Sequence, residues 1–311
     1  MVMDFEIGLF GRKRRIRAVD NVSLGIGRGE IYGLVGESGS GKSTIGRITL
    51  RLYKPTSGKV FFDGRDITNL SENRLRELRR KMQLIPQDPY SAINPAQTIG
   101  EALAEPLIVH EKMSRLEALE KAYKALEEVG LVPPDEFIKR RPYELSGGQL
   151  QRVVIARAML LGPSYVVADE PTSNLDASIR ASIIKLLLDF KNRYNLSMLF
   201  ITHDIALISL IANRIGVLYL GQLVEEGPAE KVVSSPLHPY TKALLTATPL
   251  ASEELEIEKI YLKGEIGDPS NPPKGCRLHP RCPFALEKCR SLEPPTINVG
   301  GNRFVKCWLY S

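Results

Sequence analysis

The chain has 311 residues, of which 43% are hydrophobic and 25% charged, so it can form one large globular domain and a smaller appendage. Its 42 basic and 36 acidic residues give a net charge of +6 and are interspersed along the sequence. This distribution argues against nucleic-acid binding as the main function. The one basic run, at residues 12–17, is best interpreted as a solvated turn before a strand.

No segment predicts a secretion signal or a membrane-spanning helix. The first residues alternate between polar and apolar types and lack an apolar core. The best candidate for a membrane span, residues 205–220, is interrupted by Asn213 and Arg214, which favours a buried helix followed by a strand. We therefore expect a soluble chain whose contact with a membrane depends on partner proteins.

Strands and helices are predicted to alternate along most of the chain. In order, we expect a strand at 31–35, a helix at 44–52, a hairpin at 59–64, a helix at 75–81, a strand at 82–85, a mainly helical region from 90 to 160, a strand at 165–168, a helix at 177–194 and a strand at 198–202. Within the helical region, Ser114 and Glu117 form a capping-box pattern. The alternation predicts an α/β fold with a parallel sheet and a helical insertion at about 88–160.

The composition changes after residue 235, where prolines become frequent and long apolar periodicity ends. We therefore predict a main domain over residues 1–235 and a small C-terminal accessory domain over 236–311.

The most specific motif is at residues 36–44, which read GESGSGKST and match the phosphate-loop pattern G-x-x-x-x-G-K-[ST]. Glycines allow backbone N–H groups to surround a phosphate, Lys42 supplies a positive charge, and Ser43 is suited to bind Mg²⁺. The motif lies between a predicted strand and a predicted helix, which disfavours a flexible loop that matches by chance. The candidate ATP-binding residues are Gly36, Glu37, Ser38, Gly39, Ser40, Gly41, Lys42, Ser43 and Thr44.

Polar residues follow three other predicted strands. Asp169 and Glu170 end the apolar run at 165–168, where Asp169 is suited to hold Mg²⁺ and Glu170 to polarise an attacking water. We expect the two side chains to diverge because of the strand pleat. His203 and Gln87 also follow strands, so we expect His203 to reach the γ-phosphate and Gln87 to reach Mg²⁺ or the water.

Residues 145–149 read LSGGQ and begin a helical run. Glycines at a helix start leave N–H groups available to an anion, and a second anion site in one chain suggests a second nucleotide. At this point the chain resembles the ATP-binding subunits of ATP-binding cassette (ABC) transporters. The resemblance implies a P-loop nucleotide hydrolase core, and it implies that one subunit's LSGGQ segment closes over the ATP of its partner. The residues so implicated are Ser146, Gly147, Gly148 and Gln149.

The same resemblance implies roles for single residues. Gln87 would sense the membrane subunits, Glu170 would be the catalytic carboxylate and His203 the switch histidine. Residues 173–176, which end at Asp176, would form a dimer contact, although Asn174 stands where the family often has alanine. Phe10 would stack on adenine.

Two stretches narrow the resemblance to the dipeptide and oligopeptide importers: residues 87–95 and residues 238–245, which read HPYTKALL. Residues 41–47 and 55–58 are more similar to the second, "F"-type ATPase subunit than to the "D" type. The resemblance implies a second ATPase subunit, two transmembrane permease subunits, an extracytoplasmic solute-binding protein that acts indirectly, and a place at the cytoplasmic face of the membrane. Oligosaccharides or metal chelates are alternative cargoes.

The four cysteines all lie in the C-terminal tail, at Cys276, Cys282, Cys289 and Cys307. Their clustering in a chain without a secretion signal indicates a local metal site rather than disulfides. Four thiolates suit tetrahedral zinc or an iron–sulfur cluster, or the cysteines pack as small apolar residues without metal. Some peptide-importer ATPases resemble this tail and carry a [4Fe-4S] cluster, which the resemblance implies here.

Two functions of other classes compete with transport. A soluble ABC ATPase of translation or DNA repair would resemble tandem or coiled-coil-interrupted chains, whereas this chain has one phosphate loop. A phosphate-loop kinase would leave the LSGGQ segment without a role.

Overall fold

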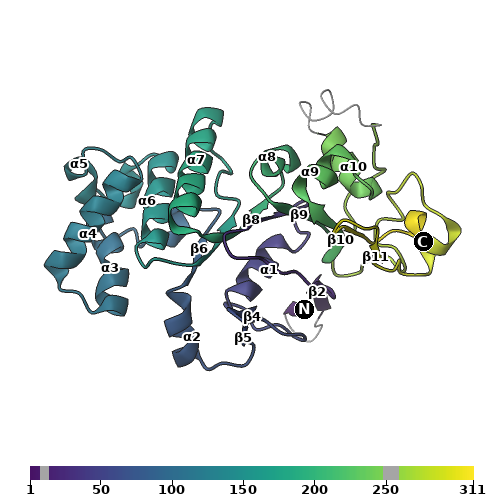
Figure 1. Ribbon diagram of the computed structural model, residues 1–311, viewed down its shortest axis with the longest axis horizontal. Helices are drawn as coiled ribbons and strands as arrows, with labels where there is room; N and C mark the ends of the chain where they lie inside the picture. Colours follow the sequence, from purple (N-terminus) through teal and green to yellow (C-terminus); the bar gives the residue numbers. More distant parts are fainter. Residues whose placement is uncertain (8–13, 248–258) are drawn as a thin grey trace. The chain divides into compact units, whose positions relative to one another are not determined.

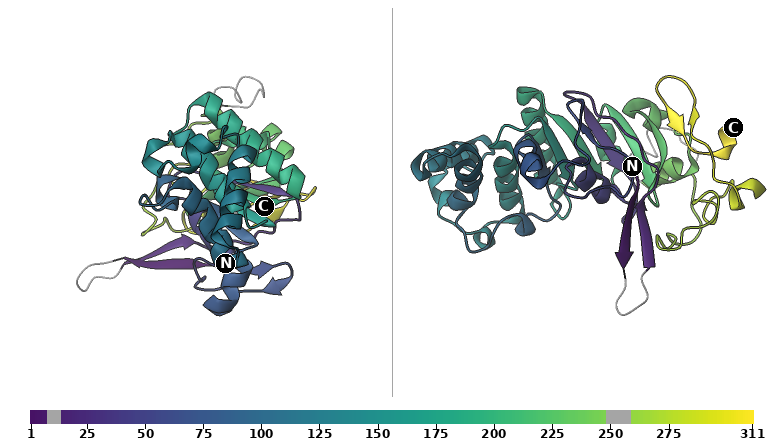
Figure 2. Two further views of the ribbon diagram at one scale, coloured as in Figure 1. Left: turned by 90° about the vertical axis from the view of Figure 1, so that its left-hand side faces the viewer. Right: turned by 90° about the horizontal axis from the view of Figure 1, so that it is seen from below.

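The computed structural model describes residues 1–7, 14–247 and 259–311, which form two compact units (Figures 1 and 2). Unit 1 comprises Met1–Ile26, Glu30–Asn69 and Phe200–Ser311. Unit 2 comprises Gly27–Gly29 and Leu70–Leu199. The chain passes from unit 2 into unit 1 within strand β8 (Ser197–Thr202).

Unit 1 contains a sheet in which neighbouring strands follow the order β11-β12-β10-β9-β3. Their bounds are β3 Ile31–Val35, β9 Arg214–Tyr219, β10 Gln222–Pro228, β11 Ile297–Asn298 and β12 Phe304–Val305. Strand β3 is parallel to β9 and buried along its whole length, as expected for an apolar run in a sheet covered on both faces. The other pairs are antiparallel.

The remaining elements of unit 1 surround this sheet or extend from it. They are α1 Lys42–Thr49, α8 Ile205–Ser209, α9 Ala229–Ser234, α10 Pro239–Thr246, the hairpins β1 Met3–Ile7 with β2 Arg14–Val19 and β4 Phe61–Phe62 with β5 Arg65–Asp66, and the 3₁₀ turns η3 Glu287–Arg290 and η4 Trp308–Tyr310. Figure 2 shows β1 and β2 as a narrow two-stranded ribbon. The β4–β5 turn at Asp63 and Gly64 confirms the predicted hairpin, and α8 followed by β9 confirms the predicted buried helix and strand.

The C-terminal tail joins the sheet of unit 1 through β12, which pairs with β10. Beneath this pairing, the fully buried carboxylate of Glu225 accepts a hydrogen bond of 2.7 Å from Arg303. It also accepts bonds from the backbone N–H groups of Leu237 and His238, at 3.1 and 2.8 Å. The Glu225 side chain therefore binds the chain at two places: just after α9, at Leu237 and His238, and just before β12, at Arg303.

Unit 2 carries the helices around LSGGQ (Figure 1). Its elements are α2 Glu72–Arg79, β6 Met82–Ile85, η1 Tyr90–Ala92, α3 Ile99–Glu111, α4 Arg115–Glu128, α5 Asp135–Ile138, η2 Pro142–Glu144, α6 Gly147–Met159, β7 Tyr165–Asp169 and α7 Ala177–Tyr194. Strands β6 and β7 are parallel. The capping box at Ser114 and Glu117 is present, with the Glu117 N–H donating to the Ser114 hydroxyl at 3.3 Å.

The α/β class, the parallel strands and the helical region of the sequence analysis are confirmed. The boundary at residue 235 stays a prediction, and the tail is built into the sheet of unit 1. Among the described helices, none combines the length and the apolar character that a membrane span requires.

Candidate functional site

The phosphate loop of unit 1 packs directly against the backbone of neighbouring segments. A Cβ atom on Gly36 would lie 2.2 Å from the carbonyl oxygen of Leu218, and one on Gly41 would lie 2.2 Å from that of Ala18. Gly41 also has a φ of 104°, in the left-handed region where side chains are strained. Both positions therefore require glycine because the packing of the loop leaves no space for a side chain.

The lysine of the loop is buried and held by the loop itself. Lys42 is 5% exposed, and its Nζ donates to the carbonyl oxygens of Gly36 and Glu37 at 2.6 and 2.9 Å. Ser43 and Thr44 follow in the first turn of α1, while Ser38 and Gly39 are exposed at the tip of the loop. This geometry is suited to an anion at the N-terminus of α1, with a positive charge beside it.

His203 also belongs to unit 1. It follows β8 directly and is exposed. The next residue, Asp204, caps α8 by accepting a hydrogen bond of 2.9 Å from the N–H of Leu207, and its own N–H donates to Thr202 Oγ1 at 3.0 Å. These bonds fix the backbone on the carboxyl side of His203.

In unit 2, Gln87 and Glu170 are brought together. The Gln87 Nε2 atom donates to Glu170 Oε2 at 3.1 Å, although the residues are 83 positions apart. Asp169 ends β7 and is 5% exposed. Glu170 lies just beyond the strand with a φ of 46°, in the left-handed region, so the extended backbone of β7 does not continue through it; the divergence of the two side chains stays a prediction. Such a conformation costs about 1–3 kcal/mol in a residue other than glycine and is typical of functional sites.

The LSGGQ segment starts helix α6 with a reciprocal cap. The N–H of Gln149 donates to Ser146 Oγ at 3.3 Å, and the N–H of Ser146 donates to Gln149 Oε1 at 3.0 Å. Gly148 is buried, and a Cβ atom there would lie 2.6 Å from Ile179 Cγ2. Gly147 is less crowded, with a nearest contact of 3.7 Å to Leu175 Cδ2. The second glycine therefore allows α6 to approach α7 closely.

The predicted dimer-contact loop at 173–176 follows Glu170 closely. The Ser173 N–H and hydroxyl donate to the Glu170 carbonyl oxygen at 3.1 and 2.9 Å. Asn174 has a φ of 62°, which asparagine tolerates better than most residues, and exposed Asp176 precedes α7. The departure from alanine at Asn174 thus fits the local backbone.

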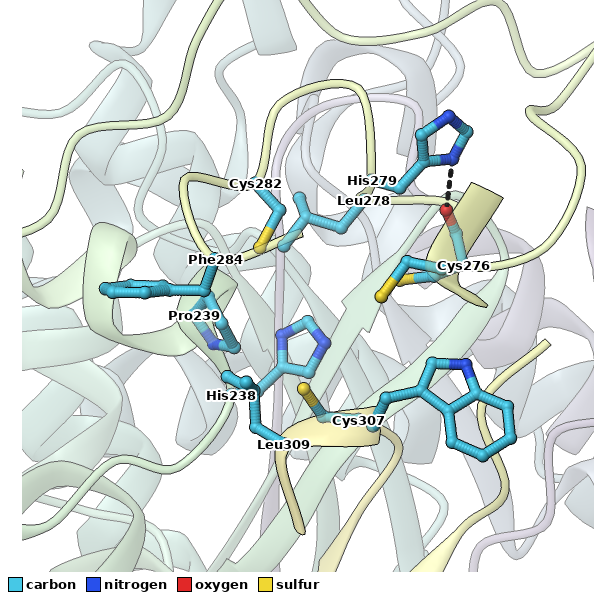
Figure 3. Close-up of a pocket in the computed structure, with 11 residues that line it drawn as sticks. His238, Pro239, Cys276, Leu278, His279, Cys282, Phe284, Cys307 and Leu309 are labelled. Carbon is cyan, nitrogen blue, oxygen red and sulfur yellow. Dashed lines mark hydrogen bonds between the residues drawn. The ribbon is translucent and has the colours of Figure 1, made fainter. Parts of the chain in front are cut away.

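All four cysteines line one pocket in the tail, together with His238, Phe284 and Trp308 among others. Figure 3 shows the sulfur atoms of Cys276, Cys282 and Cys307 turned toward a common space. Burial raises the pKa of Cys276 to about 11 and also raises the pKa values of Cys282 and Cys307. Without a bound metal these thiols therefore stay protonated at neutral pH.

Two histidines border this pocket. His279 Nδ1 lies 3.0 Å from the Cys276 carbonyl oxygen. Burial lowers the pKa of His238 to about 3, and its Nδ1 accepts a hydrogen bond from the Tyr240 N–H. Across residues 1–7, 14–247 and 259–311, no group of three or more His, Cys, Asp or Glu side chains is arranged to hold a single metal ion as it stands.

Comparison with known proteins gives the family. Residues 19–173 match the family described as "ABC transporter", and residues 224–289 match "Oligopeptide/dipeptide transporter, C-terminal region". The chain is 48% identical over 296 residues to a putative peptide import ATP-binding protein of Brucella ovis. This match covers 95% of this chain and 93% of that protein. The chain belongs to the ATP-binding subunits of ABC transporters.

Two further similarities bear on this ABC ATPase. The oligopeptide transport ATP-binding protein AppF of Bacillus subtilis is 45% identical over 308 residues, which cover 98% of this chain and 93% of that protein; its name agrees with the expected "F" type. The dimeric structure of a post-hydrolysis state of the ATP-binding cassette MJ0796 bound to ADP and Pi matches with a TM-score of 0.66 and 33% identity. That match covers 73% of this chain and 96% of the other.

Two residues that contact the phosphate loop of the ABC ATPase were not predicted from the sequence. Arg281 binds the Glu37 carboxylate, and Tyr240 accepts a hydrogen bond from the Glu37 N–H. Both come from the tail, more than 200 positions away, and no local pattern connects them with the loop. The predicted adenine contact, Phe10, lies outside the described residues.

The packing of LSGGQ predicts unequal effects of two neighbouring substitutions. We expect Gly148→Ala to destabilise the fold by about 1–3 kcal/mol, because the new methyl group overpacks against Ile179. Gly147→Ala is the matched control: it meets only ordinary contacts, and alanine favours the helix, so stability should be unchanged or slightly higher. Thermal unfolding measures both, and equal stability of the two variants would contradict this account of Gly148.

Proposed function

We propose that this ABC ATPase is one of two ATP-hydrolysing subunits that drive a membrane importer of peptides. The observation that carries the proposal is the match of residues 224–289 to the C-terminal region of oligopeptide/dipeptide transporters, outside the ATPase core. The relatives from Brucella ovis and Bacillus subtilis are named as peptide import and oligopeptide transport proteins. The cargo proposed here is therefore a peptide, in preference to an oligosaccharide or a metal chelate.

We assign ATP to the phosphate loop at residues 36–44. The backbone N–H groups at the start of α1 would bind phosphate oxygens, and Lys42 would exchange its bonds to the Gly36 and Glu37 carbonyls for phosphate. Phe10 is assigned to adenine by the resemblance. Ser146, Gly147, Gly148, Gln149 and Asp176 are assigned to the ATP and the surface of the second ATPase subunit.

The residues suited to Mg²⁺ are Ser43, Asp169 and Gln87. They offer a hydroxyl, a carboxylate and an amide oxygen, the hard ligands that this ion prefers. Because Gln87 Nε2 donates to Glu170, the Oε1 atom of Gln87 is the one that would bind a metal or a water. When bound, Mg²⁺ would neutralise charge on the transferred phosphoryl group.

We assign the activation of water to Glu170 and the γ-phosphate contact to His203. The Gln87 amide donates to the Glu170 carboxylate at 3.1 Å and so orients the group that would accept a proton from water. Asp169 ends the strand and Glu170 begins the left-handed turn after it, so the two carboxylates stand on different backbone conformations and are assigned separate tasks. Phosphoryl transfer depends mainly on such positioning and on charge stabilisation.

The assignment to Glu170 predicts a separation of binding from turnover. We expect Glu170→Gln to bind ATP as the unaltered chain does and to form a stable ATP-bound dimer, while ATP turnover falls by about 10²-fold or more. Glu120→Gln, on the exposed surface of α4, is the control and should leave turnover unchanged. Phosphate release and gel filtration with ATP measure the two effects; near-normal turnover by Glu170→Gln rules out the assigned role.

The proposed partners are a related ATPase subunit, two transmembrane permeases and, indirectly, a solute-binding protein outside the membrane. We expect the chain isolated gently from its own cells to be recovered with the membrane fraction, together with a second ATPase and two permeases. Mass spectrometry of the purified complex identifies them. Recovery with ribosomes or DNA instead of membranes would favour a soluble ABC ATPase of translation or DNA repair.

We further propose that the cysteine pocket holds a [4Fe-4S] cluster with a structural role. A zinc ion requires its four ligands to converge on one point, whereas the thiolates of a cluster bind different iron atoms. All four cysteines surround one pocket, and the resemblance to peptide-importer ATPases that carry such a cluster favours it over zinc. Cys276, Cys282, Cys289 and Cys307 would be the ligands.

This proposal predicts a coloured protein. Chain purified without oxygen should absorb broadly in the visible region and contain equal amounts of iron and acid-labile sulfide, because thiolate-bound clusters carry both. Cys289→Ser and Cys307→Ser should each lose most of the iron. Stoichiometric zinc in a colourless protein would support the zinc alternative, and the absence of both metals would mean that the cysteines pack as apolar residues.

A further inference from the structure

The tail that carries the cysteines also contacts the phosphate loop. Arg281, the residue before Cys282, binds the Glu37 carboxylate with two nitrogens: Nη1 lies 2.8 Å from Oε2, and Nη2 lies 3.2 Å from Oε1. The Arg281 side chain is 11% exposed and that of Glu37 27% exposed, so the pair is largely removed from solvent. A two-pronged arginine–carboxylate contact is the strongest ion-pair geometry in proteins.

Two tyrosines complete this contact. The Arg281 guanidinium carbon lies 5.9 Å from the centre of the Tyr219 ring, and the Glu37 N–H donates to Tyr240 Oη at 2.8 Å. Tyr240 is fully buried, and burial strongly raises its pKa, so it stays neutral. Glu37 is thus fixed at its carboxylate by Arg281 and at its backbone N–H by Tyr240 of α10, while Tyr219 of β9 packs against Arg281.

The backbone position of Arg281 is set by the cysteine pocket. Its N–H and that of Cys282 both donate to the Leu278 carbonyl oxygen, at 2.9 and 3.0 Å. The N–H of Cys276 donates to the Cys289 carbonyl oxygen at 2.8 Å, which closes the turn that carries Arg281. Figure 3 labels Cys276 and Cys282 at the two ends of this turn.

A second arginine of the same turn supports the other side of the loop. Arg277 donates to the Leu220 carbonyl oxygen and to the Asp20 carboxylate. The next residue after Leu220, Gly221, donates its N–H to the Ser40 carbonyl oxygen at 2.8 Å. The tail therefore reaches the phosphate loop directly at Glu37 and indirectly at Ser40.

We propose that Arg281 is a positioning residue for ATP, which connects the cysteine-bearing tail to the phosphate loop. It does so in two ways. It holds the loop backbone at Glu37 in the shape that receives phosphate, and it neutralises a carboxylate that would otherwise repel the phosphates at short range. The ordered tail is thereby a requirement for full nucleotide affinity, whichever group occupies the cysteine pocket.

The test compares MgADP affinity, by calorimetry, in variants of the full chain. Arg281→Gln should weaken MgADP binding about tenfold, because it removes a charged, partly buried hydrogen-bond pair. It should raise the KM for ATP by a similar factor while kcat changes less than twofold. Arg290→Gln is the matched control: it removes the same charge from an exposed position of the same tail and should bind MgADP normally.

A third variant separates positioning from general destabilisation. Because Glu37→Gln removes the repelling charge, the double variant Glu37→Gln/Arg281→Gln should bind MgADP more tightly than Arg281→Gln alone. The proposal is overturned if the losses of MgADP affinity in the two single variants simply multiply in the double variant. It is also overturned if Arg281→Gln lowers the melting temperature but leaves the MgADP affinity unchanged. If Arg281→Gln does not fold, Arg281→Lys is tested in its place, with Arg290→Lys as its control. Equal MgADP affinities of these two lysine variants would also overturn the proposal.

Discussion

The contact of the phosphate loop with the surrounding main chain is the constraint on which the rest of unit 1 depends. A Cβ atom on Gly36 or Gly41 would lie 2.2 Å from the carbonyl oxygen of Leu218 or Ala18, and the Gly221 N–H donates to the Ser40 carbonyl oxygen. Since these contacts are with backbone atoms, no side-chain rearrangement can relieve them. This close packing restricts the conformations open to the loop, and such restriction lowers the entropic cost of binding.

The tail is attached to the same sheet by a buried charge. Glu225 is fully buried and would be costly to desolvate alone, but Arg303 and the N–H groups of Leu237 and His238 satisfy its oxygens. An apolar contact could hold this segment in several registers, whereas these directional bonds fit only one. The segments that bear Tyr240 and the cysteine turn are thus set in one position relative to the strands that surround the phosphate loop.

The sequence predicts local features of this protein well and distant contacts poorly. The strand before Gly36, the turn at Asp63 and Gly64, and the cap at Ser114 were predictable because each depends on neighbouring residues. The bond from Gln87 to Glu170 and the ion pair of Arg281 with Glu37 join residues that are 83 and 244 positions apart. Nothing in the local sequence of either partner identifies the other. The backbone turn at Glu170 was also unpredictable, because a glutamate rarely adopts a positive φ.

The cap at the start of α6 leaves the Ser146 hydroxyl able to bind a second group. The Ser146 oxygen accepts from the Gln149 N–H, and this bond occupies one lone pair of the oxygen. A hydroxyl has one O–H donor besides its lone pairs. The Ser146 hydroxyl can therefore cap its own helix and still donate a hydrogen bond to an acceptor outside the helix. Recognition of a phosphate oxygen by Ser146 would then need no unwinding of the helix end. Threonine could do the same there, whereas aspartate, a good cap that lacks the hydrogen, would keep the helix and repel the anion.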